Sequence, residues 1–326
     1  MAELTLVQAV NAALARAMQE DARVLVLGED VGRDGGVFRA TDGLIARFGG
    51  DRVLDTPLAE LGIVGLSVGL AAQGMRPVAE IQFSGFIYPT LDQMVNHASR
   101  LRTRTRGRLT CPMVLRAPNG GGIHAPEHHS ESVEAMFAGI PGLRVVIPSS
   151  PAKAYGLLLA AIRDPDPVVF LEPTRAYRAV KEKVEDDGRA LPLDRSFVLR
   201  EGSDLTIVAW GGMVRDALAS ADALAAEGIA AEVIDLATLK PLDRATILKS
   251  VARTGRCLIL QEAALTGGFG AEVAACLAGE GLTSLLAPVE RVAGYDTVMP
   301  LPRLEHHYLP GSPRILAAAH RVLEYR

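Results

Sequence analysis

The chain has 326 residues, and at about 150 residues per domain this length predicts two domains. Its 34 basic and 38 acidic residues give a net charge of −4, which excludes a strongly basic nucleic-acid-binding protein as the default. Cys111, Cys257 and Cys276 form no CxxC pair, which argues against an iron–sulfur cluster, a cysteine zinc site or a disulfide framework. The N-terminus is typical of an amphipathic helix rather than a signal peptide, and no stretch approaches about 18 unbroken apolar residues. We therefore expect a cytoplasmic protein in a reducing compartment, without a membrane span.

The first half alternates between strand-like and helical segments. Apolar residues from Val7 to Met18 recur at helical spacing and predict an opening helix. Further helices are predicted over residues 60–74, 90–102 and 151–163, and strands over 24–30, 77–83, 112–118, 143–148 and 167–173. The strands are short continuous apolar runs, which are typical of parallel strands buried on both faces. This alternation predicts a parallel sheet covered by helices.

A polar stretch at 181–194 carries charge, Gly and Pro but little apolar periodicity, so we place the domain boundary there. The expected domains are residues 1–185 and 186–326. In the second domain strands are predicted over 204–211, 230–236, 256–262 and 289–295, and helices over 213–227, 243–252, 270–280 and 312–324. The predicted fold class is α/β in both domains.

Two short motifs have ordinary structural explanations. Residues 65–69 match the GxSxG elbow of α/β-hydrolases, but that elbow needs a preceding strand and Ser67 lies within a predicted helix. Gly62, Gly65 and Gly69 instead thin one helix face, which suits a packed subunit contact. Ser150 precedes a proline at the start of a predicted helix, where its side chain is expected to accept a hydrogen bond from an unpaired amide.

The loop at 119–132 is the most informative stretch. It carries three consecutive glycines and then His124, His128 and His129 after a predicted buried strand. Long loops with titratable groups at the carboxyl ends of parallel strands commonly carry chemistry, and histidine exchanges protons near neutral pH. A metal-dependent hydrolase is a distant alternative, because Pro126 and the glycines prevent one helix face from presenting His124 and His128.

Two further features stay open when taken alone. Glu60 follows a proline turn at the start of a predicted helix, where a glutamate ordinarily serves as a cap or a dipole partner. The basic run at 100–108 has no interleaved aromatic residues, and it suits a solvated face, an anion site or a docking patch.

Several longer motifs, taken together and in order, are far more specific than any single one. They are GEDVG at 28–32, GGVFRAT at 35–41, DTPLAE at 55–60, EIQF at 80–83, PEHHS at 126–130, and IRDPDPVVFLEP at 162–173. With these motifs the chain resembles, essentially end to end, the β subunit of the thiamine-diphosphate-dependent E1 component of 2-oxo acid dehydrogenase complexes. The resemblance implies a pyrimidine-binding α/β domain with a parallel sheet, followed by a transketolase C-terminal-type α/β domain.

The resemblance also implies roles for individual residues. Glu60 stands where the family carries the glutamate that hydrogen-bonds N1′ of the cofactor's aminopyrimidine. Leu58, Gln82 and Phe86 occupy the matching positions around that ring. His129 matches the family's active-site histidine, whose implied role is proton transfer as the acyl group passes to the lipoyl arm.

The chain lacks the GDG…N motif that holds magnesium and diphosphate in this cofactor class. The resemblance therefore implies an E1 α subunit that holds Mg²⁺, an α2β2 heterotetramer, and the dihydrolipoyl acyltransferase E2 as a further partner, without nucleic acid or membrane. It also implies a structural potassium ion in some relatives. The matching positions here are Met113, Val114, Ala161, Asp164 and Asp166.

Three interpretations and one substrate question remain open at this stage. The first is an E1 β subunit that decarboxylates a 2-oxo acid and reductively acylates the lipoyl group of E2. The others are a transketolase-like or sugar-phosphate synthase half enzyme, and a non-catalytic scaffold. The loop at 119–132 looks like that of pyruvate-type relatives, whereas residues 202–211 and 262–273 look like branched-chain ones, so the 2-oxo acid is unresolved.

Overall fold

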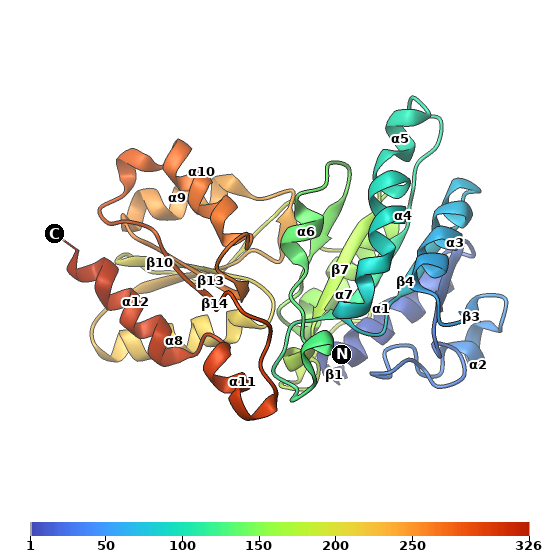
Figure 1. Cartoon of the computed structure of the whole chain (residues 1–326), viewed down its shortest axis with the longest axis horizontal. Helices are drawn as coiled ribbons and strands as arrows, with labels where there is room; N and C mark the ends of the chain where they lie inside the picture. The colour runs from blue at the N-terminus through green and yellow to red at the C-terminus, as the bar shows by residue number, and fades with distance from the viewer. Residues whose placement is uncertain (1, 326) are drawn as a thin grey trace.

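The computed structural model describes residues 2–325, in which two helix-covered sheets lie beside each other (Figure 1). The first sheet has the order β12-β6-β7-β5-β4-β2-β3, and all its strand pairs are parallel except β12 with β6. Its strands are β2 (Val24–Gly28), β3 (Val53–Asp55), β4 (Arg76–Glu80), β5 (Val114–Asn119), β6 (Arg144–Val146), β7 (Val168–Pro173) and β12 (Thr238–Lys240). The central strands are buried throughout, as their continuous apolar runs predicted.

Helices cover both faces of the first sheet. Helices α1 and α7 pack on one face, where their small and apolar side chains form one buried cluster with the strands. The helical segments of this half are α1 (Leu6–Glu20), α2 (Leu44–Phe48), α3 (Glu60–Ala72), η1 (Ser84–Thr90), α4 (Leu91–Asn96), η2 (Ala98–Arg100), α5 (Leu101–Arg104), η3 (Glu127–His129), α6 (Glu134–Ala138), α7 (Pro151–Arg163) and η4 (Thr174–Ala176). A short ladder pairs β1 (Ala2–Leu4) with β8 (Glu182–Val184).

The second sheet has the order β14-β13-β10-β11-β9, with only β9 antiparallel to its neighbour. Its strands are β9 (Phe197–Arg200), β10 (Leu205–Ala209), β11 (Ala231–Asp235), β13 (Cys257–Ala264) and β14 (Glu290–Gly294). Its helical segments are α8 (Met213–Ala226), α9 (Arg244–Thr254), α10 (Gly270–Glu280), η5 (Leu282–Ser284), α11 (Pro302–Tyr308) and α12 (Ser312–Glu324). The fold class is therefore α/β in both halves, as predicted.

The two halves of the chain share a strand, a hydrophobic cluster and an ion pair. Strand β12 comes from the second half of the chain but forms the edge of the first sheet beside β6. One hydrophobic cluster also runs from Leu115 of the first sheet to Ile234 and Ile259 of the second. Lys153 of α7 pairs with the fully buried Asp235 of β11 at 3.2 Å. The change of sheet falls between β8 and β9, and the domain boundary at 185/186 stays a prediction.

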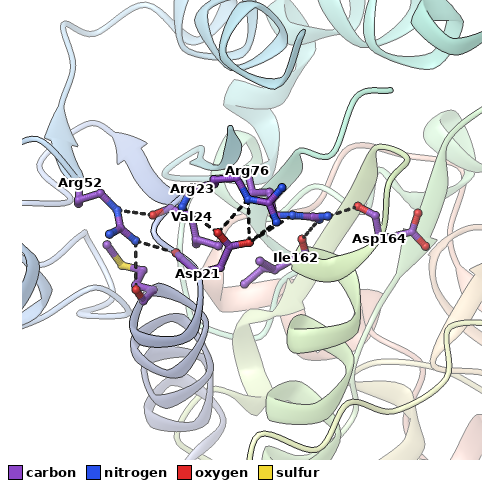
Figure 2. Close-up of polar contacts among 8 residues, drawn as sticks. Asp21, Arg23, Val24, Arg52, Arg76, Ile162 and Asp164 are labelled. Atoms are coloured by element: carbon purple, nitrogen blue, oxygen red, sulfur yellow. Dashed lines mark hydrogen bonds and ion pairs between the residues drawn. The ribbon is translucent and has the colours of Figure 1, made fainter. Parts of the chain in front are cut away.

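Two arginines tie helix ends to the first sheet (Figure 2). Arg52 donates to the carbonyl oxygens of Met18 and Asp21 at the end of α1, both at 3.1 Å. Arg76 donates to the carbonyl oxygens of Ile162 and Asp164 at the end of α7, at 2.7 and 3.2 Å. The last carbonyls of a helix lack partners within the helix, so a guanidinium there supplies hydrogen bonds and a favourable charge.

Two predictions about helices are wrong in detail. The segment 90–102 is not one helix but the pieces α4, η2 and α5, and Ser99 Oγ donates to the carbonyl oxygen of Val95 at 2.8 Å where the helix breaks. The side chain of Ser150 makes no capping hydrogen bond at α7. Instead, Glu182 of β8 accepts from the amide of Ala152 at 3.0 Å. Within residues 2–325, no helix combines the length and the apolar character that crossing a membrane requires.

Candidate active site at the carboxyl ends of the first sheet

Two carboxylates lie at the carboxyl edge formed by β2 and the segment after β3. Glu29 directly follows β2, and Glu60 is the first residue of α3. The Thr56 amide donates to the carbonyl oxygen of Gly28 at 3.0 Å and fixes the segment that leads to α3 against the end of β2. Burial raises the pKa of Glu29, and the nearby charges of Glu60 and Asp30 raise it further. Glu29 is a site residue for which the sequence analysis proposed no role.

Three buried polar atoms near this edge lack a hydrogen-bond partner among the described residues. They are Glu29 Oε1, Thr56 Oγ1 and His129 Nδ1. Most buried polar atoms in folded proteins are paired, so such atoms point to a ligand, to water or to another chain. The segment that leads from Thr56 to α3 also presents an apolar side chain to the outside, because Leu58 is 81% exposed. The edge therefore has both polar and apolar groups available for a bound molecule.

Aromatic rings pack around His129. The ring of Phe83 lies 4.3 Å from the His129 ring and the ring of Phe86 lies 5.1 Å from it, centroid to centroid. The ring of His128 lies 5.2 Å from the ring of Phe86, centroid to centroid. Both phenylalanines follow the end of β4, so β4 and η1 carry the surface against which the histidine loop rests.

Gly85 allows this close approach. A Cβ at Gly85 would lie 1.9 Å from the carbonyl oxygen of His128, which is a backbone atom and cannot easily move away. Ser84 Oγ also donates to the carbonyl oxygen of Glu131 at 2.8 Å. The turn of η1 thus packs directly on the backbone of the loop that carries His128 and His129.

A buried cluster of charged side chains lies at the end of β4. Arg116 of β5 pairs with Glu80 and with Glu172, the latter through two bonds of 2.7 and 2.9 Å. Tyr177 donates to Glu172 at 2.7 Å. Burial raises the pKa of Glu80, and Arg116 opposes this rise. The paired charges fix the strand ends from which Gln82 and the two phenylalanines follow.

The structure places the predicted cofactor residues along one edge. Glu60 begins α3, and Leu58 precedes it by two residues. Gln82 follows β4, and Phe86 of η1 contacts His129. The structure thus brings the His129 loop against the end of β4, while Glu60 lies close enough to Glu29 to affect its ionisation. The contacts of these residues with a cofactor stay predictions.

The positions predicted for potassium lie where α7 leads into β7. Met113 O accepts from Val168 N at 3.0 Å, and the Asp164 carboxylate pairs with Arg144 at 2.9 Å. Asp166 pairs with Arg102 at 2.7 Å. Arginines pair with both carboxylates, and the backbone carbonyl oxygens at these positions each have a second lone pair available to an ion.

The remaining sequence motifs occupy structural positions. Ser67 is buried within α3 and donates to the carbonyl oxygen of Ile63 at 2.9 Å, as expected of a helical residue rather than a nucleophile. No group of three or more His, Cys, Asp or Glu side chains in residues 2–325 is arranged to hold a metal ion. The basic run lies on α5 and the turn after it, on a helical arm that projects from the first sheet (Figure 1).

Known proteins resemble this chain over its whole length. The family profile of the transketolase pyrimidine binding domain matches residues 2–180, and that of the transketolase C-terminal domain matches 195–315. The chain is 48% identical to the pyruvate dehydrogenase E1 component subunit beta of Acholeplasma laidlawii over 326 residues, and 49% identical to that of Bacillus subtilis over 325 residues, with 100% of each chain covered. Among solved structures, a split gene transketolase described as an inactive beta4 tetramer matches with a TM-score of 0.82 at 27% identity, covering 99% of both chains.

Proposed function

This chain belongs to the β subunits of the E1 component of 2-oxo acid dehydrogenases, and on that premise we propose that it forms the pyrimidine-binding half of a thiamine diphosphate site. At this site a 2-oxo acid is decarboxylated and its acyl group passes to the lipoyl group of an E2 acyltransferase. The observation that carries the proposal is the set of unpaired buried atoms, Glu29 Oε1, Thr56 Oγ1 and His129 Nδ1, at the carboxyl edge of the first sheet. A binding site for a polar ring requires such groups.

Glu60 is the proposed activating carboxylate. Bound thiamine diphosphate supplies an electron sink for the bond next to the carbonyl carbon of a 2-oxo acid. Glu60 holds a proton at N1′ of the aminopyrimidine, so that the cofactor's own amino group can act as a base. The buried Glu29 places a second carboxyl near Glu60, and burial raises the pKa of Glu29 above its ordinary value. Leu58, Gln82 and Phe86 orient the ring.

His129 is the proposed proton-transfer residue for the acyl step. The rings of Phe83 and Phe86 both pack against its ring, at 4.3 and 5.1 Å between centroids. Its Nδ1 is buried and is not engaged by another described residue, so that nitrogen is free to exchange a proton with a bound group. His128 is exposed and takes no proposed step.

A second subunit completes the site. We propose an E1 α subunit that holds Mg²⁺ and the diphosphate, in an α2β2 heterotetramer that docks on E2. The exposed apolar side chains of Leu61 and Leu66 on α3, the helix that Glu60 begins, support a subunit contact along this helix. A Cβ added at Gly69 would have nothing within 4 Å, so this part of α3 has room for a close neighbour. Such a contact would also exclude water from Glu60.

Pyruvate is the proposed substrate, because the relatives reported above are pyruvate dehydrogenase subunits at 48% and 49% identity. Branched-chain 2-oxo acids are the alternative. A transketolase-like half enzyme is less well supported, since the transketolase structure is only 27% identical.

A potassium ion is a further proposal. It would bind backbone carbonyl oxygens near Met113, Ala161 and Asp164. The chain should then unfold at a higher temperature in KCl than in NaCl at equal ionic strength, and equal unfolding temperatures would contradict this proposal.

The test of the proposed function is co-expression with the α subunit, followed by assays on pyruvate and on 3-methyl-2-oxobutanoate. We expect the larger kcat/KM on pyruvate, and Glu60→Gln should abolish turnover on both while leaving assembly intact. A preference for the branched substrate would overturn only the substrate assignment. Near-normal activity of Glu60→Gln would overturn the site itself.

A further inference from the structure

The glycine-rich start of the histidine loop is held by two carboxylates from the second half of the chain. Glu262 of β13 accepts from the amide of Gly121, and Glu305 of α11 accepts from the amide of Gly122 at 2.6 Å and from that of His124 at 3.2 Å. Both carboxylates are buried. The loop therefore begins with backbone amides that point into an acceptor pair more than 140 residues away in sequence.

Side chains from other segments occupy the space where a Cβ atom would lie at each of the three glycines, so no larger residue fits there unless these side chains move. A Cβ at Gly120 would approach Glu262 Oε1 to 2.3 Å, and one at Gly121 would approach Met299 Cε to 2.6 Å. A Cβ at Gly122 would lie 3.0 Å from Cβ of Arg175. Gly120 and Gly122 also have φ of +81° and +87°, which L side chains rarely adopt. The loop is thus shaped to receive these side chains.

The base of the loop, where its two ends meet, is anchored to the first sheet. The amide of Gly120 donates to the carbonyl oxygen of Glu131 at 2.8 Å and closes the loop at its base. Thr174 Oγ1 donates to the carbonyl oxygen of Gly120 at 2.8 Å. In sequence, His128 and His129 lie between His124, which Glu305 binds, and Glu131, where the loop closes.

Arg175 of η4, in the first half of the chain, bridges Glu262 and a second carboxylate of the second half. Its guanidinium lies 3.5 Å from Glu262 and donates to Asp216 of α8 at 2.6 Å. Glu262 therefore has an opposite charge beside it and keeps a defined orientation despite its burial.

From this geometry we propose that Glu262 and Glu305 are positioning residues, which set the place of His129 from the second domain. The proposal rests on the proposed role of His129 and extends it to two residues that do not touch the cofactor edge. Removing either carboxylate releases loop amides, and the ring of His129 then loses its fixed position against Phe83. The reaction slows although cofactor binding is kept.

The experiment compares Glu262→Ala and Glu305→Ala in the assembled enzyme with Glu262→Gln and Glu305→Gln. The amide oxygen of glutamine still accepts a hydrogen bond, so the Gln variants test rescue without charge. Glu290→Ala is the matched control, because Glu290 of β14 pairs only with Arg321 of α12 among the described residues. The measurements are hydrogen exchange of the peptide covering residues 120–124, kcat and KM for lipoyl acylation, and the dissociation constant of thiamine diphosphate.

We expect both Ala variants to raise the exchange rate of this peptide at least tenfold and to lower kcat at least tenfold. KM and cofactor affinity should change less than twofold, and the Gln variants should recover most of kcat. Unchanged exchange, or faster exchange with normal kcat, would overturn the proposal. If Glu60→Gln retained activity the proposed function would fail, whereas the exchange result would still decide whether these carboxylates hold the loop.

Discussion

His129 is the residue on which the acyl step depends in our proposal. Its ring packs against both Phe83 and Phe86, and its Nδ1 is buried. Its neighbour His128 is exposed, and its ring lies 5.2 Å from that of Phe86. The two adjacent histidines therefore differ in burial, and only His129 has a buried ring nitrogen without a partner among the described residues. This difference supports His129 rather than His128 as the reacting group.

His129→Ala should lower the rate of lipoyl acylation by at least a hundredfold, because general acid–base catalysis contributes roughly 10²–10⁴-fold. Cofactor affinity should change little, because the proposed contacts with the aminopyrimidine ring come from Glu60, Leu58, Gln82 and Phe86, whereas His129 is assigned to the acyl step. Stopped-flow acylation of a lipoyl domain, with calorimetric binding of thiamine diphosphate, measures the two effects separately. His128→Ala is the control, and equal losses in the two variants would count against this assignment.

At the scale of single residues, sequence reasoning assigned roles to Glu60, Gln82 and His129 because each stands in a motif of the resemblance, and these roles stay predictions. It gave Glu29 no role, although GEDVG was recognised, because that role depends on the spatial neighbour Glu60. Glu262 and Glu305 were also missed. Their partners lie 141 and more than 180 residues away, and no local pattern records such a contact.

At the scale of elements, continuous apolar runs predicted the long buried strands. They did not predict β3 or β12, which are three residues long and lie outside any longer apolar run, whereas the equally short β6 lies within the run at 143–148. The break after α4 was also missed. It depends on the hydroxyl of Ser99 and on the backbone of Gly142, where a Cβ would lie 2.2 Å from the carbonyl oxygen of Ser99.

The packing of η1 on the histidine loop leads to a prediction for Gly85→Ala. The added Cβ would lie 1.9 Å from the His128 carbonyl oxygen, so the loop must shift. We expect a loss of about 1–3 kcal/mol in the free energy of unfolding and a large loss of activity. Denaturant unfolding of the chain and assays of the assembled enzyme check both. Gly279→Ala, at a helical position with nothing within 4 Å, should keep both properties near normal.

At the scale of the whole molecule, this chain carries only one side of the proposed cofactor pocket. Alone it should bind thiamine diphosphate weakly, and added Mg²⁺ should not change the affinity, because the metal ligands are expected on the α subunit. Isothermal titration calorimetry with and without Mg²⁺ gives the measurement. Tight, magnesium-dependent binding by the isolated chain would contradict the shared site.

Stability of the full chain should depend on pH through Glu262. Burial raises the pKa of this carboxyl from 4.5 to about 7, while Arg175 opposes the rise. Other ionisable groups that face it are Glu134, Asp216 and Tyr308. A raised folded-state pKa gives stability that is fully present below pH 4.5 and is lost as pH rises through 7.

The free energy of unfolding should therefore fall by on the order of 3 kcal/mol across that range because of this group. Urea unfolding at several pH values should show that Glu262→Gln removes this dependence, while Glu290→Gln retains it. A wild-type pH profile in Glu262→Gln would show that another group is responsible.

The crossing of β12 into the first sheet has a consequence for any attempt to divide the molecule. A fragment ending between β8 and β9 would keep β6 but lose the strand that pairs with its outer edge. The free amides and carbonyls of β6 would then form a template onto which strands of other copies can add. Such a fragment should aggregate through this exposed edge. The second half of the chain therefore protects the first half from self-association, in addition to its effect on the histidine loop.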